Sequence, residues 1–110
     1  MSLSEIVIAS MPEYINRIKN NYISLDNALD RKVTDYDKQW LDSVRYVIST
    51  KYIKVITGSS VHSFILLEDD KQFEAGDILK ASSWNAPARN FARGNVRAPS
   101  TYESVSWTGA

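Results

Sequence analysis

The apolar positions in the first part of the chain recur at helical spacing. They fall three or four residues apart, which is the spacing that lines one face of an α-helix: Met11, Tyr14, Ile15, Ile18 and Tyr22. Ser10, Pro12 and Glu13 form a start signal, because serine caps a helix, proline suits its first turn and a glutamate three residues later closes a capping box. The sequence therefore predicts a helix from Ser10 to about Asn21. The preceding run, Leu3 to Ala9, fits either a strand or a helical turn.

Two further helices are predicted before the pattern changes. Leu25, Ala28 and Leu29 indicate a short second helix. Thr34 with Asp37 is another capping pattern, and the apolar face of a third helix follows it, ending near Ser49: Trp40, Leu41, Val44, Val47 and Ile48. Such an aromatic and branched stripe is typical of a helix that packs on a hydrophobic core.

After Thr50 the apolar residues form short β-branched and aromatic runs. Tyr52–Ile56 and Val61–Leu67 are separated by Gly58-Ser59-Ser60, which predicts a β-hairpin. Glu68–Lys71 is expected to turn the chain at the surface.

Two more strands are expected further along the chain. Gly76-Asp77 predicts a tight turn, Asp77–Ala81 a third antiparallel strand and Tyr102–Trp107 a fourth. Helices followed by a meander indicate an α+β fold, with N-terminal helices packed on a small antiparallel sheet and an irregular C-terminal loop.

Composition narrows the class of protein. A chain of 110 residues matches one domain, residues 1–110. It has no cysteine and one histidine, which argues against a disulfide scaffold, a zinc or iron site and a cofactor bound through them. No apolar run approaches the roughly 20 residues of a membrane span, and the N-terminus lacks the pattern of a signal peptide. We therefore expect a soluble cytoplasmic protein without metal or cofactor.

Charge is balanced overall but unevenly distributed. Thirteen basic and thirteen acidic residues give a net charge of zero, which argues against a binder of duplex DNA. The segment from Ile78 to Ala110, however, holds four basic residues and one acidic residue. This distribution predicts an anion-attracting C-terminal segment, or a solvated basic face.

The segment Ser82–Arg97, called here the C-terminal loop, carries the chemistry of that basic half. Pro87 and Gly94 interrupt regular structure and are expected to leave backbone amides available to a ligand. Three arginines spaced four apart supply forked donors for phosphate or carboxylate: Arg89, Arg93 and Arg97.

Aromatic and amide side chains complete the composition of the loop. Trp84 and Phe91 offer stacking faces, and three asparagines offer amides that pair with a base edge: Asn85, Asn90 and Asn95. Together with the arginines they indicate a nucleotide site. In the alternative, the two aromatic rings pack into the core and the arginines pair with acidic residues of the preceding part of the chain, residues 1–77.

Catalytic chemistry has little support in the sequence. His62 is expected on a strand face with Phe64 and Leu66, where a histidine serves either as a structural residue or as a base or ligand contact. There is no nucleophile elbow, Walker loop or HExxH motif, and no triad partner for His62. The sequence therefore indicates a binding protein without enzymatic activity.

Gly76–Lys80 and Trp84–Val96, with the pattern GDILK…SW.APA…ARGN, resemble a signature of small phage-encoded proteins. One characterised group that the chain resembles is the first-described Thoeris anti-defence family. Its members are non-catalytic sponges that bind cyclic ADP-ribose isomers made by bacterial TIR-domain immune enzymes. A C-terminal loop there presents two arginines four residues apart to the ligand's diphosphate, at sites formed in a dimer interface.

The resemblance implies that Arg89 and Arg93 contact phosphate. Phe91, Asn90, Trp84 and Asn95 are the remaining candidate ligand-binding residues. It also implies a homodimer or higher homo-oligomer that sequesters a cyclic nucleotide in the cytoplasm of an infected bacterium. A phage structural or host-interaction protein, or a weak binder of single-stranded nucleic acid, stays open as an alternative.

Overall fold

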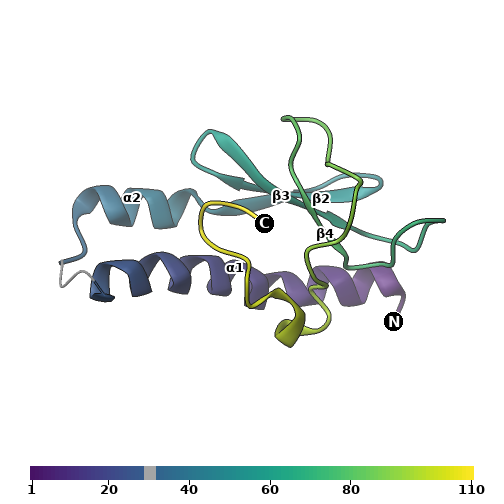
Figure 1. Ribbon diagram of the computed structural model, residues 1–110, viewed down its shortest axis with the longest axis horizontal. Coiled ribbons are helices and arrows are strands. Elements are labelled where there is room, and N and C mark those ends of the chain that lie inside the picture. Colours follow the sequence, from purple (N-terminus) through teal and green to yellow (C-terminus); the bar gives the residue numbers. More distant parts are fainter. Residues whose placement is uncertain (29–31) are drawn as a thin grey trace.

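The computed structural model describes residues 1–28 and 32–110 and begins with one long helix, α1 (Leu3–Ala28), which lies along the long axis of the molecule (Figure 1). Its start is capped by Ser2, whose Oγ accepts a hydrogen bond from Glu5 N at 3.2 Å. The predicted start at Ser10 is wrong, because Pro12 lies inside the helix. There, Ser10 Oγ donates to Ile6 O at 2.8 Å.

The remaining helix predictions are partly correct. Residues 3–9 are helical, which resolves the choice between strand and helical turn. No separate second helix forms at Leu25 and Ala28, because α1 continues through them, and Leu29 lies outside the described residues.

Helix α2 (Asp35–Ser43) begins as predicted and ends early. Its capping box is confirmed: Thr34 Oγ1 accepts from Asp37 N at 3.2 Å, and Asp37 Oδ2 accepts from Thr34 N at 2.8 Å. The predicted continuation to Ser49 is wrong, because the chain turns extended at Val44 and forms strand β1 (Arg45–Ile48). Pairing of β1 with the neighbouring strand overrides the helical spacing of its apolar residues.

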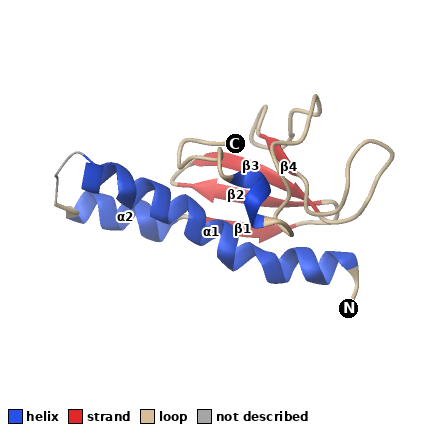
Figure 2. Ribbon diagram, turned by 60° about the horizontal axis from the view of Figure 1, so that its bottom comes forward, coloured by secondary structure: helices blue, strands red, loops and turns tan. Residues whose placement is uncertain are grey.

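Four strands form one antiparallel sheet in the order β1-β2-β3-β4 (Figure 2), which confirms the α+β class. The predicted hairpin is confirmed as β2 (Tyr52–Thr57) and β3 (Ser60–Leu66), and the predicted third strand is confirmed as the shorter β4 (Ile78–Lys80). The strand predicted at Tyr102–Trp107 is wrong. A 3-10 turn, η1 (Pro99–Tyr102), stands near that position.

Residues 99–110 pack on α1 instead of joining the sheet. The ring of Tyr102 is buried edge-on against Tyr14, with centroids 5.2 Å apart. Trp107 meets Tyr22 and Trp40, two rings that stack with centroids 4.3 Å apart. Side-chain burial on the helix therefore replaces the strand pairing that the sequence suggested.

Hydrophobic clusters form on both sides of the sheet. The larger one lies between α1, the sheet and residues 99–110, and includes Met11, Ile18, Ile53, Val55, Ile65 and Val105. The smaller one lies on the outer face: Phe64, Leu66, Phe73 and Leu79. The outer cluster is the surface on which the C-terminal loop is built, because Ala92 of the loop and Ala81 directly before it pack against it.

A β-bulge in β3 separates His62 from its predicted face. Val55 pairs with Ser63 and Ile56 with Val61, so His62 is the extra residue opposite β2. The bulge turns its ring to the α1 side, where the centroid lies 6.2 Å from that of Tyr14. The expectation that His62 shares a face with Phe64 and Leu66 is therefore wrong.

Candidate functional site

The C-terminal loop runs antiparallel along the free side of β4 and caps that edge of the sheet. Ala88 N donates to Lys80 O and Arg93 N to Ile78 O, both at 2.7 Å, and Ile78 N donates to Gly94 O at 2.9 Å. The sequence-based expectation that the amides here stay free is wrong for Ala88 and Arg93. The pairing holds the loop at two points and leaves residues 89–92 as a projection between them.

Trp84 lies on the surface of the loop beside a lysine from the sheet. Its side chain is 48% exposed, and Lys54 Nζ of β2 lies 4.8 Å from the ring centroid. The same ammonium lies 3.5 Å from Asn85 Oδ1, which accepts its hydrogen bond. This arrangement presents an indole face next to a positive charge, which suits a stacked base carrying phosphate.

Phe91 and Arg93 form a second pair of ring and cation. Phe91 is 54% exposed, and the Arg93 guanidinium carbon lies 3.9 Å from the ring centroid. Among residues 1–28 and 32–110, no hydrogen bond or ion pair engages the Arg93 side chain, and its buried Nε has no partner. The alternative in which both aromatic rings enter the core is therefore wrong.

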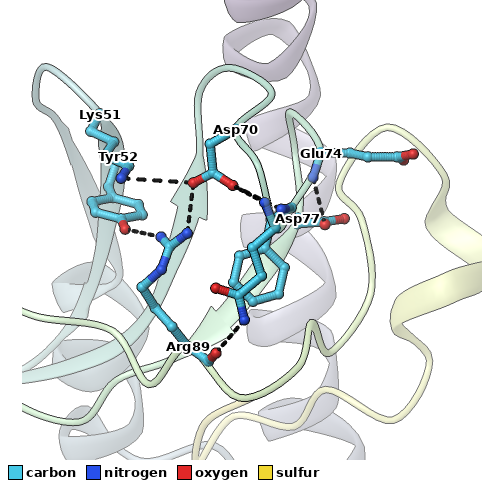
Figure 3. Close-up of polar contacts among 8 residues, drawn as sticks. Lys51, Tyr52, Asp70, Glu74, Asp77 and Arg89 are labelled. Atoms are coloured by element: carbon cyan, nitrogen blue, oxygen red, sulfur yellow. Dashed lines mark hydrogen bonds and ion pairs between the residues drawn. The ribbon is translucent and has the colours of Figure 1, made fainter.

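Arg89 has the surroundings of an anchored side chain (Figure 3). Its Nη2 lies 2.6 Å from Asp70 Oδ2, its Nη1 donates to the Tyr52 hydroxyl, and its guanidinium carbon lies 4.9 Å from the Phe73 ring centroid. Gln72 Nε2 donates to the Arg89 carbonyl at 2.7 Å. Arg89 therefore forms an ion pair with an acidic residue, as the alternative for the arginines expected.

Asp70 anchors Arg89 from a tightly organised turn. Its Oδ1 accepts from the main-chain N–H groups of Gln72 and Phe73, both at 2.8 Å. The amides of Phe73 and Gln72, with the guanidinium of Arg89, lower the pKa of the Asp70 carboxyl well below its usual range. Asp70 in turn raises the pKa of Arg89. Asp70 and Arg89 therefore both stay ionised at neutral pH.

Asn90, Asn95 and Arg97 differ in the hydrogen bonds that they make to the rest of the protein. Asn95 Nδ2 donates to Ala75 O and to Asp77 Oδ1, each at 3.0 Å, while its Oδ1 accepts from Arg97 N at 2.9 Å. Arg97 Nε donates to Ala75 O at 2.9 Å. Asn90 is exposed, and its Oδ1 accepts from the next amide at 2.9 Å. Asn95 and Arg97 thus brace the base of the loop, and Asn90 keeps its amide nitrogen for solvent or ligand.

The structure adds three residues that sequence reasoning did not place at the site. Lys54 and Tyr52 reach it from β2, two residues apart on the outer face, and Asp70 reaches it from the turn before β4. The alternation along β2 is the signal that places Tyr52 and Lys54 on one face. Which face meets the loop depends on the fold.

His62 belongs to a buried hydrogen-bond chain away from the loop. Its Nε2 lies 2.7 Å from Ser106 O, a group that only accepts, so Nε2 carries the proton and Nδ1 accepts from Ser63 Oγ at 2.8 Å. Ser63 Oγ accepts from the Tyr14 hydroxyl at 2.8 Å. Burial lowers the pKa of His62 and raises that of Tyr14. Both ring nitrogens are thus in use, which gives His62 a structural role.

Comparisons with known proteins give no match for the chain. No protein-family model matches the chain, and neither the curated proteins nor the solved structures contain a significant match. Neither helix within residues 1–28 and 32–110 has the length and hydropathy of a membrane-spanning segment. The same residues hold no cluster of acidic and histidine side chains suited to a metal ion.

Proposed function

We propose that the chain binds an anionic cyclic nucleotide on the C-terminal loop and sequesters it without cleaving it. The observation that carries the proposal is the pair of exposed rings, each beside a cation: Trp84 with Lys54 and Phe91 with Arg93. A base stacks on the ring, and the neighbouring cation meets phosphate. The resemblance to the Thoeris anti-defence family makes a cyclic ADP-ribose isomer the ligand class, and phage immune evasion the setting.

The magnitude of these contacts sets the affinity that the site can reach. A stacked base contributes about 1 to 3 kcal/mol, and a charge-assisted hydrogen bond about 1.5 to 3 kcal/mol. Two rings and two cations then supply roughly 5 to 12 kcal/mol before the cost of association, which is about 4 kcal/mol or more. Micromolar affinity needs about 8 kcal/mol after that cost, so these contacts reach it at the upper end of their range. Sequestration requires only this binding, since the ligand is withheld rather than converted.

Arg93 and Arg89 are proposed to act differently on the ligand. The Arg93 guanidinium makes no competing hydrogen bond within the part of the chain that the structure describes, so it is the principal phosphate contact. Arg89 donates two of its N–H groups to Tyr52 and Asp70. A guanidinium carries five N–H groups, so three remain to bind phosphate. Because those contacts already fix its position, Arg89 loses little conformational freedom on meeting a phosphate.

The experiment is a thermal-shift panel of cyclic ADP-ribose isomers and cyclic oligonucleotides. A bound ligand at 100 times its Kd stabilises the protein by about 2.7 kcal/mol. We expect Arg93→Ala to abolish the shift and Arg89→Ala to reduce it, while Arg45→Ala, on the strand at the opposite edge of the sheet, keeps it. Arg93→Lys tests the fork specifically, because it keeps the charge and loses the planar donors.

Two results would reject the proposal. One is the absence of any shift across the panel. The other is recovery of broken ligand after heat denaturation, which would indicate hydrolysis in place of sequestration. Sedimentation with and without ligand tests the homodimer or higher homo-oligomer that the resemblance implies.

The exposed rings also favour a second candidate, a binder of single-stranded nucleic acid. Two ring and cation pairs on one loop are the kind of surface on which successive bases stack. Such binding weakens steeply with salt. Retention of an oligonucleotide at low salt, without a shift from any cyclic nucleotide, would favour this candidate.

A further inference from the structure

Strand β1 leaves one edge of the sheet open, opposite the edge that the C-terminal loop caps. Ser49 N donates to Tyr52 O at 2.9 Å, and the alternation of an antiparallel ladder then turns the N–H and C=O groups of Tyr46 and Ile48 away from β2. Within the described residues, no other hydrogen bond engages these main-chain groups. β1 therefore offers free donors and acceptors to an added strand.

An apolar groove lies along the same edge. It has a volume of about 400 Å³ and is lined by Pro12, Ile15 and Asn16 of α1 together with Val44, Arg45 and Tyr46. Tyr46 and Ile48 lie on the α1 side of β1, because they pair with the core residues Val55 and Ile53. A strand added to β1 would place alternate side chains on that side, over the groove.

A positive charge without a carboxylate partner stands at one end of the edge. Among the described residues that line the groove, Arg45 alone is charged. Its Nη1 donates to Ser43 O at 2.8 Å and to Gly58 O at 3.2 Å, and in the described part of the chain no carboxylate pairs with it. Natural edge strands usually carry lysine, proline or a cover against unwanted pairing. β1 instead exposes Val47 and Ile48, which are 49% and 48% exposed.

We propose that β1 is a docking edge for an extended peptide of a partner protein, which adds as an antiparallel fifth strand with an acidic residue opposite Arg45. Main-chain hydrogen bonds to Tyr46 and Ile48 supply the affinity of such strand addition, and the groove selects apolar side chains at alternate positions. The antiparallel register gives the order apolar, any residue, apolar, acidic, opposite Ile48, Val47, Tyr46 and Arg45 in turn.

A second copy of this chain fits the edge less well. Two β1 strands paired about Val47 would set Ser49 of one copy opposite Arg45 of the other, so no carboxylate would reach the guanidinium. The Tyr46 ring of each copy also packs against its own core and is not available to enter the groove of the other. The unpaired charge therefore favours an acidic peptide over self-association.

The test uses a fluorescein-labelled probe peptide, Thr-Val-Thr-Ile-Glu-Thr, and a matched probe with lysine in place of glutamate. Fluorescence anisotropy with the full chain is expected to show at least tenfold tighter binding of the acidic probe. Ile48→Pro removes one outward N–H that β2 does not use, and an edge strand tolerates proline there. It should weaken binding at least tenfold, whereas Ile48→Ala, which keeps the N–H, should weaken it far less.

Charge reversal at Arg45 and hydrogen exchange at the β1 amides test the same edge without the proline variant. Arg45→Glu should exchange the preference between the two probes. In the wild-type chain, the acidic probe should slow hydrogen exchange at the amides of Tyr46 and Ile48 by at least tenfold. Equal binding of both probes by the wild type and Arg45→Glu, or unchanged exchange at these amides, would overturn the proposal. So would a dimer of the wild-type chain that Ile48→Pro abolishes, because the occupant would then be a second copy.

Discussion

The substitution Gly94→Ala tests how the C-terminal loop is held, because Gly94 stands where the loop crosses η1. Its φ of +148° is a conformation that residues with a side chain rarely adopt. An added Cβ would lie 2.5 Å from Thr101 O and 3.1 Å from Tyr102 Cβ. The main chain of Thr101 cannot rotate away, so the loop and η1 must separate.

The expected cost follows from two contributions. A side chain in such a backbone conformation costs on the order of 1 to 3 kcal/mol. Separation from η1 also strains the bonds from Ile78 N to Gly94 O and from Asn95 N to Thr101 Oγ1, and losing one of them costs about 1 kcal/mol. Gly94→Ala should therefore lower the free energy of unfolding by about 2 to 4 kcal/mol, which is a Tm fall of roughly 10 to 20 °C for a domain of this size.

Urea denaturation followed by tryptophan fluorescence measures this loss, and Gly58→Ala is the matched control. Gly58 also has a positive φ, +61°, but no atom lies within 4 Å of an added Cβ. Its replacement should cost only the backbone preference, about 1 kcal/mol. Equal losses in the two variants would refute the reasoning, because the close approach to Thr101 would then contribute nothing.

Three further predictions concern polar groups. Burial of the His62 ring disfavours its charged form and lowers its pKa. Its contribution to stability is therefore complete above pH 6.5 and is lost as the pH falls below that value. Between pH 8 and 5.5, the urea midpoint should fall more for the wild type than for His62→Gln. Because the pKa of Asp70 is lowered, its carboxylate stabilises the fold above pH 3.8, and this stabilisation is lost in stronger acid. Asp70→Asn should therefore reduce the fall of the urea midpoint between pH 5 and 2.5, and an unchanged fall would contradict the stabilising role of Asp70. Tyr14→Phe removes the buried bond to Ser63 and should cost about 1 kcal/mol of unfolding free energy by the same urea assay, whereas no loss would mean that this bond adds no net stability.

Local patterns in the sequence predicted much of the fold. The capping box at Thr34, the hairpin around Gly58 and the strand near Ile78 depend on neighbouring residues, and the structure confirms each. Ser2 and Glu5 form the same kind of start signal, and it was available in the sequence. The serine and proline before Glu13 resembled a second start, because a proline inside a helix is rare.

Other features depend on contacts that local patterns do not contain. Val44, Val47 and Ile48 continue the spacing of α2, and only pairing with β2 makes the last two part of a strand. The bulge at His62 likewise follows from register between strands. At the candidate site, the spacing of the arginines made Arg89 and Arg93 equal candidates for phosphate. A partner 19 residues away, Asp70, distinguishes them.

The bulge at His62 also affects how the chain tolerates insertion and deletion. Side chains alternate faces along a strand, so the loss of one residue from a regular ladder moves every position on one side of the loss to the wrong face. Here the extra residue lies between the hairpin turn at Gly58 and the core positions from Ser63 onward. Deletion of His62 would therefore restore a regular ladder in which Val61 still pairs with Ile56 on the outer face and Ser63 still pairs with Val55. The bulge is thus a position at which β3 can lose a residue without moving its core side chains to the wrong face.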